Sequence, residues 1–285
     1  MRSRQQVKTP EHSNDYGTPP VVGGRIDLPD WEEYLHYMYL PVRMPGDGSV
    51  RLPQRLEFAR RTVTVAIWDH IMRGGAFEDC HVYLTVRRGW ASPGNPLNRP
   101  GWHTDGFGGT DINYVWADRY PTLFAEQCFT GISEDHQLSV DQFTDQLDPE
   151  RIVTYPDRTL LRLDPSVVHS VPEIPAPGGT RSFLKVSFSP DRYDLAGNAH
   201  NYLFDYDWPM YSREVVRNDP SRANTDSGGT RLDGHGQGSR RPGIPAEREK
   251  IPAAPSSSGS IDASSCSDPH CTECGPTAPG GGDHE

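Results

Sequence analysis

Short segments with the composition of β-strands, separated by turns rich in glycine and proline, fill most of the chain between residues 81 and 189. Many short strands joined by such turns are typical of a β-sandwich or a β-barrel. The segments that we expect to form strands are 81–88, 111–118, 122–129, 152–155, 159–163, 169–171 and 181–189. The sequence therefore predicts a mainly β fold, without an internal repeat.

Two segments ahead of these strands have the pattern of helices that flank a sheet. In the segment 53–72, apolar residues recur every three or four positions and form one stripe, which Gly74 and Gly75 bring to an end. We expect another helix over residues 30–39, with Asp30 as its N-cap. A shorter helix is expected over residues 140–146, within a polar and acidic insert.

Composition sets the expected limits of the folded domain. From about Asn218 onward the chain has almost no large apolar residues, so this part cannot bury enough surface to offset its ordering entropy. The first two dozen residues are similar in character. We therefore expect a flexible N-terminal tail over 1–24, one domain over 25–216 and a disordered low-complexity tail over 217–285.

Charge and cysteine content narrow the class of protein. The formal net charge is −11 and basic residues form no run longer than a pair, which disfavours nucleic-acid binding by bulk electrostatics. No stretch is apolar for long enough to span a membrane. The five cysteines suggest no disulfide framework for the domain, so we expect a reducing, cytoplasmic location.

A metal-binding pattern lies in the middle of the chain. His103 and Asp105 are two residues apart, so on an extended strand end both side chains leave from the same face. His169, from a distant predicted strand, completes two imidazoles and one carboxylate. That set occupies one face of an octahedral metal and leaves three positions open, as in non-haem Fe(II) oxygenases. His-x-Asp alone is a weak signal, because a surface turn produces the same pair.

The sequence around the second histidine strengthens this interpretation. The strand-like run 158–163 precedes His169, and a proline- and glycine-rich turn over 172–179 follows it. Arg181 then opens the next predicted strand, twelve residues after the histidine. An arginine offers an always-charged, bidentate partner for a carboxylate.

These positions resemble the pattern of the Fe(II)/2-oxoglutarate-dependent dioxygenases. The resemblance implies a double-stranded β-helix, the jelly-roll or cupin-like fold, in which His103, Asp105 and His169 are the catalytic metal ligands for Fe(II). It also implies that Arg181 binds the far carboxylate of the co-substrate 2-oxoglutarate. The activity implied is hydroxylation or another oxidation by O2, with release of succinate and CO2, and with ascorbate as a helpful reductant.

Two details depart from that pattern or are left open by it. The family often has Ser or Thr two residues after the arginine, whereas this chain has Phe183. Lys185 lies on the same strand face and could substitute, although we interpret it as a surface lysine at a strand end. The partner of the 2-oxoglutarate C1 carboxylate is not fixed by the sequence; the available residues are Tyr83, Thr85, Asn113 and Tyr114.

A second cluster of metal-ligating residue types lies in the C-terminal tail, at Cys266, His270, Cys271 and Cys274. Three thiolates and one imidazole could bind zinc. The cluster spans only nine residues and contains no large apolar residue around which a fold could form. A flexible tail exposed to redox chemistry is the alternative, and we favour it.

Two other functions are compatible with the same residues. A cupin-like metalloenzyme that does not use 2-oxoglutarate would leave Arg181 without an assigned partner. A non-catalytic β-sandwich binding protein would bind no stoichiometric iron. The substrate that we expect is a small molecule, because no extended basic or peptide-binding surface is evident; its identity and the oligomeric state are not fixed by the sequence.

Overall fold

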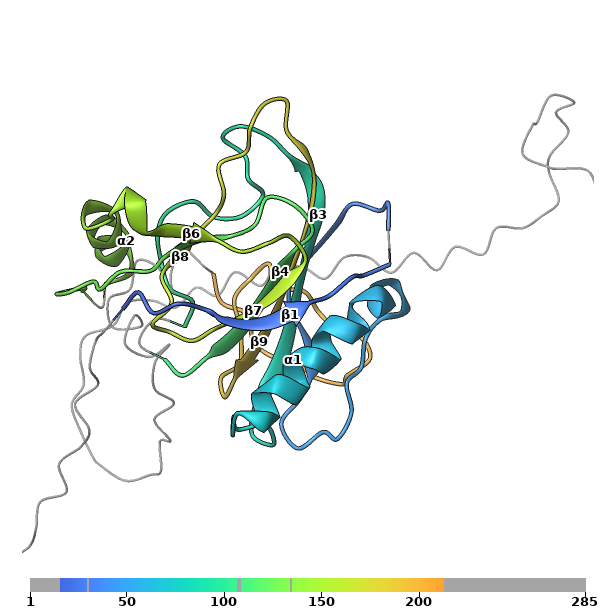
Figure 1. Cartoon of the computed structure of the whole chain (residues 1–285). Helices are drawn as coiled ribbons and strands as arrows, with labels where there is room; N and C mark the ends of the chain where they lie inside the picture. Colours follow the sequence, from blue (N-terminus) through green and yellow to red (C-terminus); the bar gives the residue numbers. More distant parts are fainter. Residues whose placement is uncertain (1–15, 30, 107–108, 134, 213–285) are drawn as a thin grey trace, which may run out of the picture. The chain divides into compact units, whose positions relative to one another are not determined.

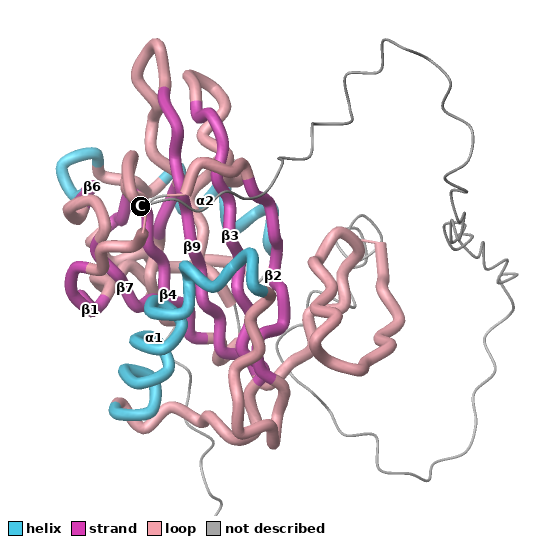
Figure 2. Tube along the Cα trace, turned by 90° about the vertical axis from the view of Figure 1, so that its right-hand side faces the viewer, coloured by secondary structure: helices cyan, strands magenta, loops and turns pink. Residues whose placement is uncertain are grey.

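The computed structural model describes residues 16–29, 31–106, 109–133 and 135–212, and these form a mainly β fold with flanking helices (Figure 1). Six strands make a large antiparallel sheet in the order β1-β7-β4-β9-β3-β2. Their bounds are β1 Val21–Arg25, β2 Leu35–Arg43, β3 His81–Ala91, β4 Ile112–Ala117, β7 Thr159–Leu163 and β9 Gly179–Ser189. Figure 2 shows these strands side by side.

A small sheet faces the large one. It has the order β6-β5-β8, with β5 Leu123–Ala125, β6 Ile152–Thr154 and β8 His169–Ser170. A bridge between His103 and His169 adds one further chain segment beside β8. Apolar side chains from both sheets, such as Phe124 and Phe183, pack together in one buried cluster. Two facing antiparallel sheets agree with the predicted double-stranded β-helix.

The helices cover the outer face of the large sheet and one end of the small one. The 3-10 helix Gln54–Ala59 leads directly into α1, Arg60–Met72, and their apolar stripe packs on the sheet, as the spacing predicts. The second helix, α2, spans His136–Asp145 and is capped by Asp135, whose carboxylate accepts a hydrogen bond from the Leu138 N–H at 2.8 Å. A short 3-10 turn, Pro149–Arg151, precedes β6.

The predicted helix over 30–39 is wrong, because part of this segment forms β2. Its strand pairs with β3 from Leu35↔Arg88 to Arg43↔Val82. The strand continues past the predicted segment through Pro41, which an edge strand tolerates, and β2 is the edge of the large sheet. Hydrogen bonding to a distant strand therefore outweighed the local helix signal.

The remaining strand predictions agree with the structure to within a few residues, except that 122–129 contains only the short β5. The predicted domain start at residue 25 falls inside β1, which pairs with β7. The predicted C-terminal tail and its Cys266–Cys274 cluster lie outside the described residues. No helix in the described ranges is long and apolar enough to cross a membrane.

Candidate metal centre

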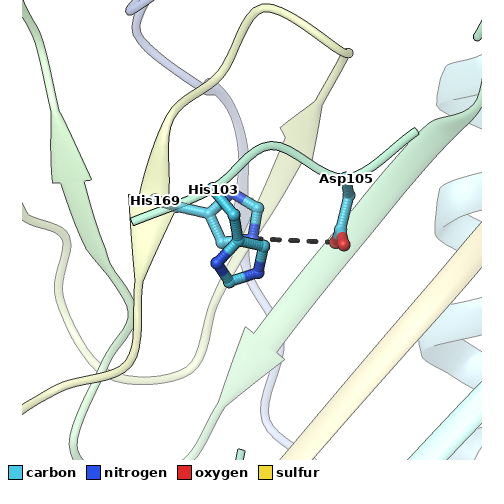
Figure 3. Close-up of side chains that lie close together, drawn as sticks. All are labelled: His103, Asp105 and His169. Carbon is cyan, nitrogen blue, oxygen red and sulfur yellow. Dashed lines mark ion pairs between the residues drawn. The ribbon is translucent and has the colours of Figure 1, made fainter. Parts of the chain in front are cut away.

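The structure brings the three predicted metal ligands together at the edge of the small sheet. The backbones of His103 and His169 are joined by two hydrogen bonds, one in each direction, of 3.0 and 2.9 Å. Asp105 follows two residues later and points at the same space (Figure 3). One ligand atom from each of the three side chains lies within 4.8 Å of the others.

Both imidazole rings are oriented by backbone carbonyls. Nδ1 of His103 lies 2.8 Å from the Gly101 carbonyl oxygen, and Nδ1 of His169 lies 3.1 Å from that of Val167. A carbonyl oxygen only accepts hydrogen bonds, so each Nδ1 carries the proton. Nε2 of each neutral ring is therefore left with its lone pair free for a metal, which is the usual arrangement of ligating histidines.

Burial keeps both histidines in their neutral form. The pKa of His103 is lowered to about 4, first by burial and then by the neighbouring His169, while Asp105 opposes the shift. Burial also lowers the pKa of His169, against the opposing effect of the Asp105 charge. At pH 7 both rings are therefore uncharged, as metal binding requires.

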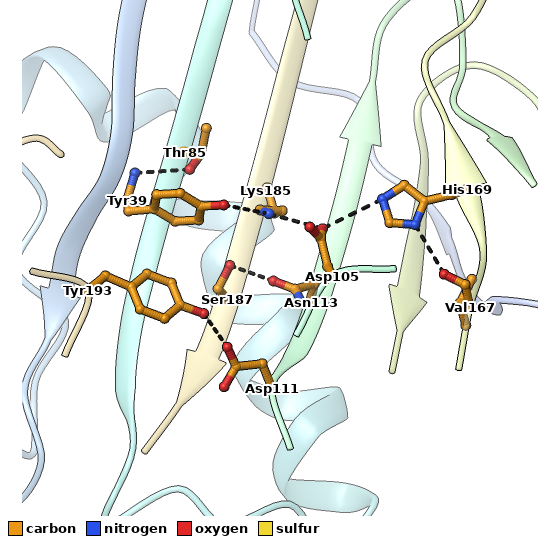
Figure 4. Close-up of polar contacts among 10 residues, drawn as sticks. All are labelled: Tyr39, Thr85, Asp105, Asp111, Asn113, Val167, His169, Lys185, Ser187 and Tyr193. Atoms are coloured by element: carbon orange, nitrogen blue, oxygen red, sulfur yellow. Dashed lines mark hydrogen bonds and ion pairs between the residues drawn. The ribbon is translucent and has the colours of Figure 1, made fainter. Parts of the chain in front are cut away.

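Asp105 is held as a carboxylate by a lysine from the large sheet. Lys185 Nζ donates to Asp105 Oδ2 at 3.0 Å and to the Tyr39 hydroxyl oxygen at 3.2 Å (Figure 4). Burial alone would raise the pKa of Asp105, but Lys185 and the two histidines outweigh it and hold that pKa well below its usual range. Lys185 is 8% exposed, so its interpretation as a surface lysine is wrong.

Tyr39 reaches this site through an irregular backbone. The pairing of β2 with β3 shifts register between Tyr37 and Leu40, and Tyr39 between them has φ 49°. A bulged strand can re-aim a side chain, and a left-handed backbone at a non-glycine residue costs about 1 kcal/mol or more. The Tyr39 N–H is taken up by Thr85 Oγ1 at 3.0 Å, which stabilises this conformation.

The donor set fits a first-row divalent metal. Two imidazole nitrogens and one carboxylate are the donor set that Fe(II) oxygenases use, and such a set would leave positions on the metal open for other ligands. The backbone acceptors on both Nδ1 atoms supply the outer contacts that such ligands need. The three predicted ligands are thus placed together, and their role as catalytic Fe(II) ligands stays a prediction.

Arg181 is buried near the start of β9. Among the described residues, none forms an ion pair with its guanidinium. It is 1% exposed, and its guanidinium donates to the Tyr120 carbonyl oxygen at 2.9 Å and to Asn98 Oδ1 at 3.1 Å. Burial lowers the pKa of Arg181 to about 10, so the side chain stays charged at pH 7. The charge of Asp118 opposes that shift, but the hydrogen bonds of the guanidinium go to neutral oxygens, which makes Arg181 a reasonable partner for an anionic ligand.

The strand face between Arg181 and Lys185 is apolar. Phe183 lies there, packs in the cluster that joins the two sheets, and places its ring centroid 5.2 Å from Arg181 Cζ. Of the four residues proposed for the C1 carboxylate, Tyr114 faces the helix side, where its hydroxyl donates to Asp69. Asn113 bonds Ser187 on the inner face, beside Lys185.

Sequence reasoning missed the environment of Lys185 and the role of Tyr39. The alternation of β9 did carry a signal, because it places Arg181, Phe183 and Lys185 on one face. For Tyr39 the signal was hidden, since the segment was expected to be helical. Neither Asp111 nor Tyr193, whose hydroxyl donates to Asp111 at 2.5 Å beside this site, was singled out.

No protein-family model matches the sequence, and no curated protein matches it either. Among solved structures, EvdO2 from Micromonospora carbonacea var. aurantiaca overlaps with 50% of this chain and 69% of its own, at 14% identity and a TM-score of 0.31. The same protein complexed with 2-oxoglutarate overlaps with 56% of this chain and 80% of its own, at 13% identity and a TM-score of 0.31. This overlap assigns no family, and the function proposed below is argued from the site itself.

Proposed function

We propose that this chain is a non-haem Fe(II)- and 2-oxoglutarate-dependent dioxygenase that hydroxylates or otherwise oxidises a small-molecule substrate. The observation that carries the proposal is the meeting of two imidazole rings and one carboxylate, with one ligand atom of each within 4.8 Å of the others. His103, His169 and Asp105 would hold the metal. A cytoplasmic location and the use of ascorbate belong to the same proposal.

Bound Fe(II) would supply the activation of O2, with 2-oxoglutarate converted to succinate and CO2 and one oxygen atom transferred to the substrate. The residues of this chain provide the rest. The carbonyls of Gly101 and Val167 fix the two rings, so neither histidine has to reorient when the metal enters.

Arg181 is the residue that we assign to the far carboxylate of 2-oxoglutarate. Its planar guanidinium has five N–H donors. Two of them donate to the Tyr120 carbonyl oxygen at 2.9 Å and to Asn98 Oδ1 at 3.1 Å. An incoming carboxylate would give the buried charge a directly bonded counter-ion; the nearby Asp118 carboxylate acts on Arg181 but forms no ion pair with it among the described residues.

Water is kept from one side of the centre by apolar side chains. The ring centroid of Phe124 lies 6.2 Å from that of His169, and Phe124 belongs to the buried cluster between the two sheets. Such a wall strengthens the electrostatic contacts at the site and protects reactive species from side reactions.

The test is succinate formation from 2-oxoglutarate by the full chain with Fe(II) and ascorbate. Turnover is expected for the wild type, slowly even without substrate, and is expected to be lost in His103→Ala, His169→Ala and Asp105→Ala. His36→Ala, in an exposed position on β2, is the matched control and should keep its turnover.

Iron binding measured on the same samples separates the alternatives. Iron bound at one equivalent without succinate, in the presence of a broad set of small-molecule substrates, would favour a cupin-like metalloenzyme that does not use 2-oxoglutarate. Absence of iron from anaerobically loaded protein would contradict the proposal and favour a non-catalytic binding protein.

A further inference from the structure

Lys185 is an exceptional residue in this chain. Lysine and arginine together number 28, yet Lys185 is the only lysine between residues 9 and 249. It is placed on the inner face of the large sheet, with its ammonium group against a residue of the candidate metal centre (Figure 4).

The ion pair of Lys185 depends on a carboxylate that the metal also needs. Among the described residues, Asp105 is the only carboxylate within 4.0 Å of its ammonium nitrogen. A divalent ion bound to Asp105 would take up most of that negative charge. Lys185 would then be a buried cation whose counter-ion is engaged elsewhere, and such a cation is strongly unfavourable unless another anion comes to it.

Two hydrogen-bond donors are ready for that anion. An ammonium group has three N–H donors, and within the described ranges Lys185 uses two of them, toward Asp105 and Tyr39. The Tyr39 oxygen accepts one of these bonds, so its own O–H proton is directed elsewhere. The third N–H of Lys185 and the O–H of Tyr39 are therefore adjacent donors, and a carboxylate has two oxygens to receive them.

The surroundings of Lys185 suit a small polar molecule. Its neighbours on the inner face include Thr85, Asn113 and Ser187, in contrast to the apolar cluster around Phe183. The nearby carboxyl group of Asp111 is engaged by the Tyr193 hydroxyl at 2.5 Å. The bulge and the left-handed backbone that bring Tyr39 here cost conformational free energy, and strain of this kind is found mostly at functional sites.

We propose that Lys185 and Tyr39 form the subsite for a carboxylate of the substrate that is oxidised, so the substrate class is a small organic acid. The inference rests on the proposed function, because it requires a metal on Asp105. The carboxylate belongs to the substrate and not to 2-oxoglutarate because a second buried cation, Arg181, serves the co-substrate. Arg181 and Lys185 are four positions apart on β9, so their Cα atoms are about 13 Å apart and the two cations mark separate subsites.

The scarcity of lysine makes the test direct. In full-length protein labelled with 13C at the lysine ε-carbon, only Lys8, Lys185 and Lys250 give signals, and Lys185→Arg assigns the one of interest. The protein is loaded with Zn(II), saturated with 2-oxoglutarate, and titrated with acetate or with its neutral analogue acetamide. Acetate is expected to shift the Lys185 signal saturably, while acetamide and the signals of Lys8 and Lys250 show no such change.

Two variants locate the bound acetate. Tyr39→Phe keeps the ring and removes one donor, and it should weaken acetate binding about fivefold. Lys185→Met removes the charge and also the NMR signal, so acetate binding to this variant and to the wild type is compared by the visible absorption of Co(II)-loaded protein. Half-saturation of the variant should require at least about tenfold more acetate. Lys185→Arg keeps the positive charge and should lose less affinity for acetate than Lys185→Met does.

Three outcomes would overturn the inference. The Lys185 signal could shift fully with 2-oxoglutarate and no further with acetate, which would assign Lys185 to the co-substrate. Acetate could leave the signal unchanged, or bind Lys185→Met as well as it binds the wild type. Failure of the proposed function would be recognised separately. In that case Zn(II) alone would not shift the Lys185 signal and no succinate would form, and the inference about Lys185 would then fail together with the proposed function.

Discussion

The ammonium nitrogen of Lys185 lies 3.0 Å from Oδ2 of Asp105, and this contact joins the large sheet to the candidate metal centre. Both side chains are mostly buried, with 10% and 19% of their surface exposed. The pair therefore differs from an exposed ion pair, which contributes little because water screens it.

Breaking this pair in the metal-free protein should be costly. Asp105→Asn leaves a buried, unpaired lysine, and we expect the free energy of unfolding to fall by about 3 kcal/mol. The double variant Asp105→Asn/Lys185→Met removes both charges and should recover a large part of that loss. Urea unfolding of the single and double variants measures the coupling. A loss no larger than that of Glu57→Gln, which breaks an exposed pair with Arg60, would contradict the expectation.

Metal binding should release close to no protons from its ligands at pH 7. The pKa of His103 is lowered to about 4, that of His169 is also lowered, and that of Asp105 lies well below its usual range. All three groups are then already deprotonated, so the metal displaces no proton. Titration calorimetry with Zn(II) in buffers of different ionisation enthalpy should give the same observed enthalpy. A slope equal to one proton or more would show that a ligand is protonated in the free site.

Acid should destabilise the protein in part through His81, a buried residue outside the metal centre. Burial, helped by the charge of Arg192, lowers the pKa of His81 to about 4. In the unfolded chain the pKa is near 6.5, so below that pH the unfolded state gains a proton that the folded state does not. Stability is therefore lost as pH falls from about 6.5 to about 4.

The variant His81→Phe keeps a ring between Tyr83 and Trp208 but cannot titrate. Between pH 7 and pH 5 it should lose less unfolding free energy than the wild type, by on the order of 2 kcal/mol. Urea unfolding at both pH values gives this difference. Equal losses for both proteins would show that His81 is protonated in the folded state.

Thr85 should matter for the strained backbone at Tyr39. Its Oγ1 accepts the Tyr39 N–H at 3.0 Å, so Thr85→Val leaves a partly buried donor unsatisfied at a cost of about 1–2 kcal/mol. Thr85→Ser keeps the acceptor and is the matched control. Thermal unfolding is the measurement, and a serine variant less stable than the valine variant would contradict the role given to this bond.

Arg181→Lys should separate charge from geometry in co-substrate binding. The lysine keeps a positive charge but loses the planar, two-pronged donor arrangement. We expect the KM for 2-oxoglutarate to rise about tenfold, with a smaller change in kcat, because the lost contact is made equally before and during the reaction. Steady-state succinate formation measures both constants. Arg25→Lys, at an exposed position, is the control, and an unchanged KM in Arg181→Lys would remove Arg181 from the co-substrate site.

The sequence predicted those parts of the structure that depend on local pattern. Alternation and turn residues placed β7 at 159–163, and helical spacing placed the segment that becomes Gln54–Ala59 and α1. The His-x-Asp pair and the distant His169 were enough to identify the residues that the fold gathers. Their meeting depends only on two short strand ends lying side by side, which a two-layer β fold readily provides.

What the sequence did not predict depends on contacts between distant segments. The strand β2 is fixed by hydrogen bonds to β3, which override its local helix signal. Lys185 looks like any strand lysine until residue 105 and residue 39 are brought to it from other parts of the chain. A charge environment of this kind is a property of the assembled fold and has no local pattern.

The pair of backbone hydrogen bonds between His103 and His169 has a consequence for how this centre could change. The spacing of the two positions is set by main-chain atoms, and these are present whatever side chain is attached. Exchanging either imidazole for another ligand type would therefore alter the preference for one metal over another without disturbing the frame. In this centre the side chains that bind the metal can vary, while the backbone hydrogen bonds that hold their positions stay the same.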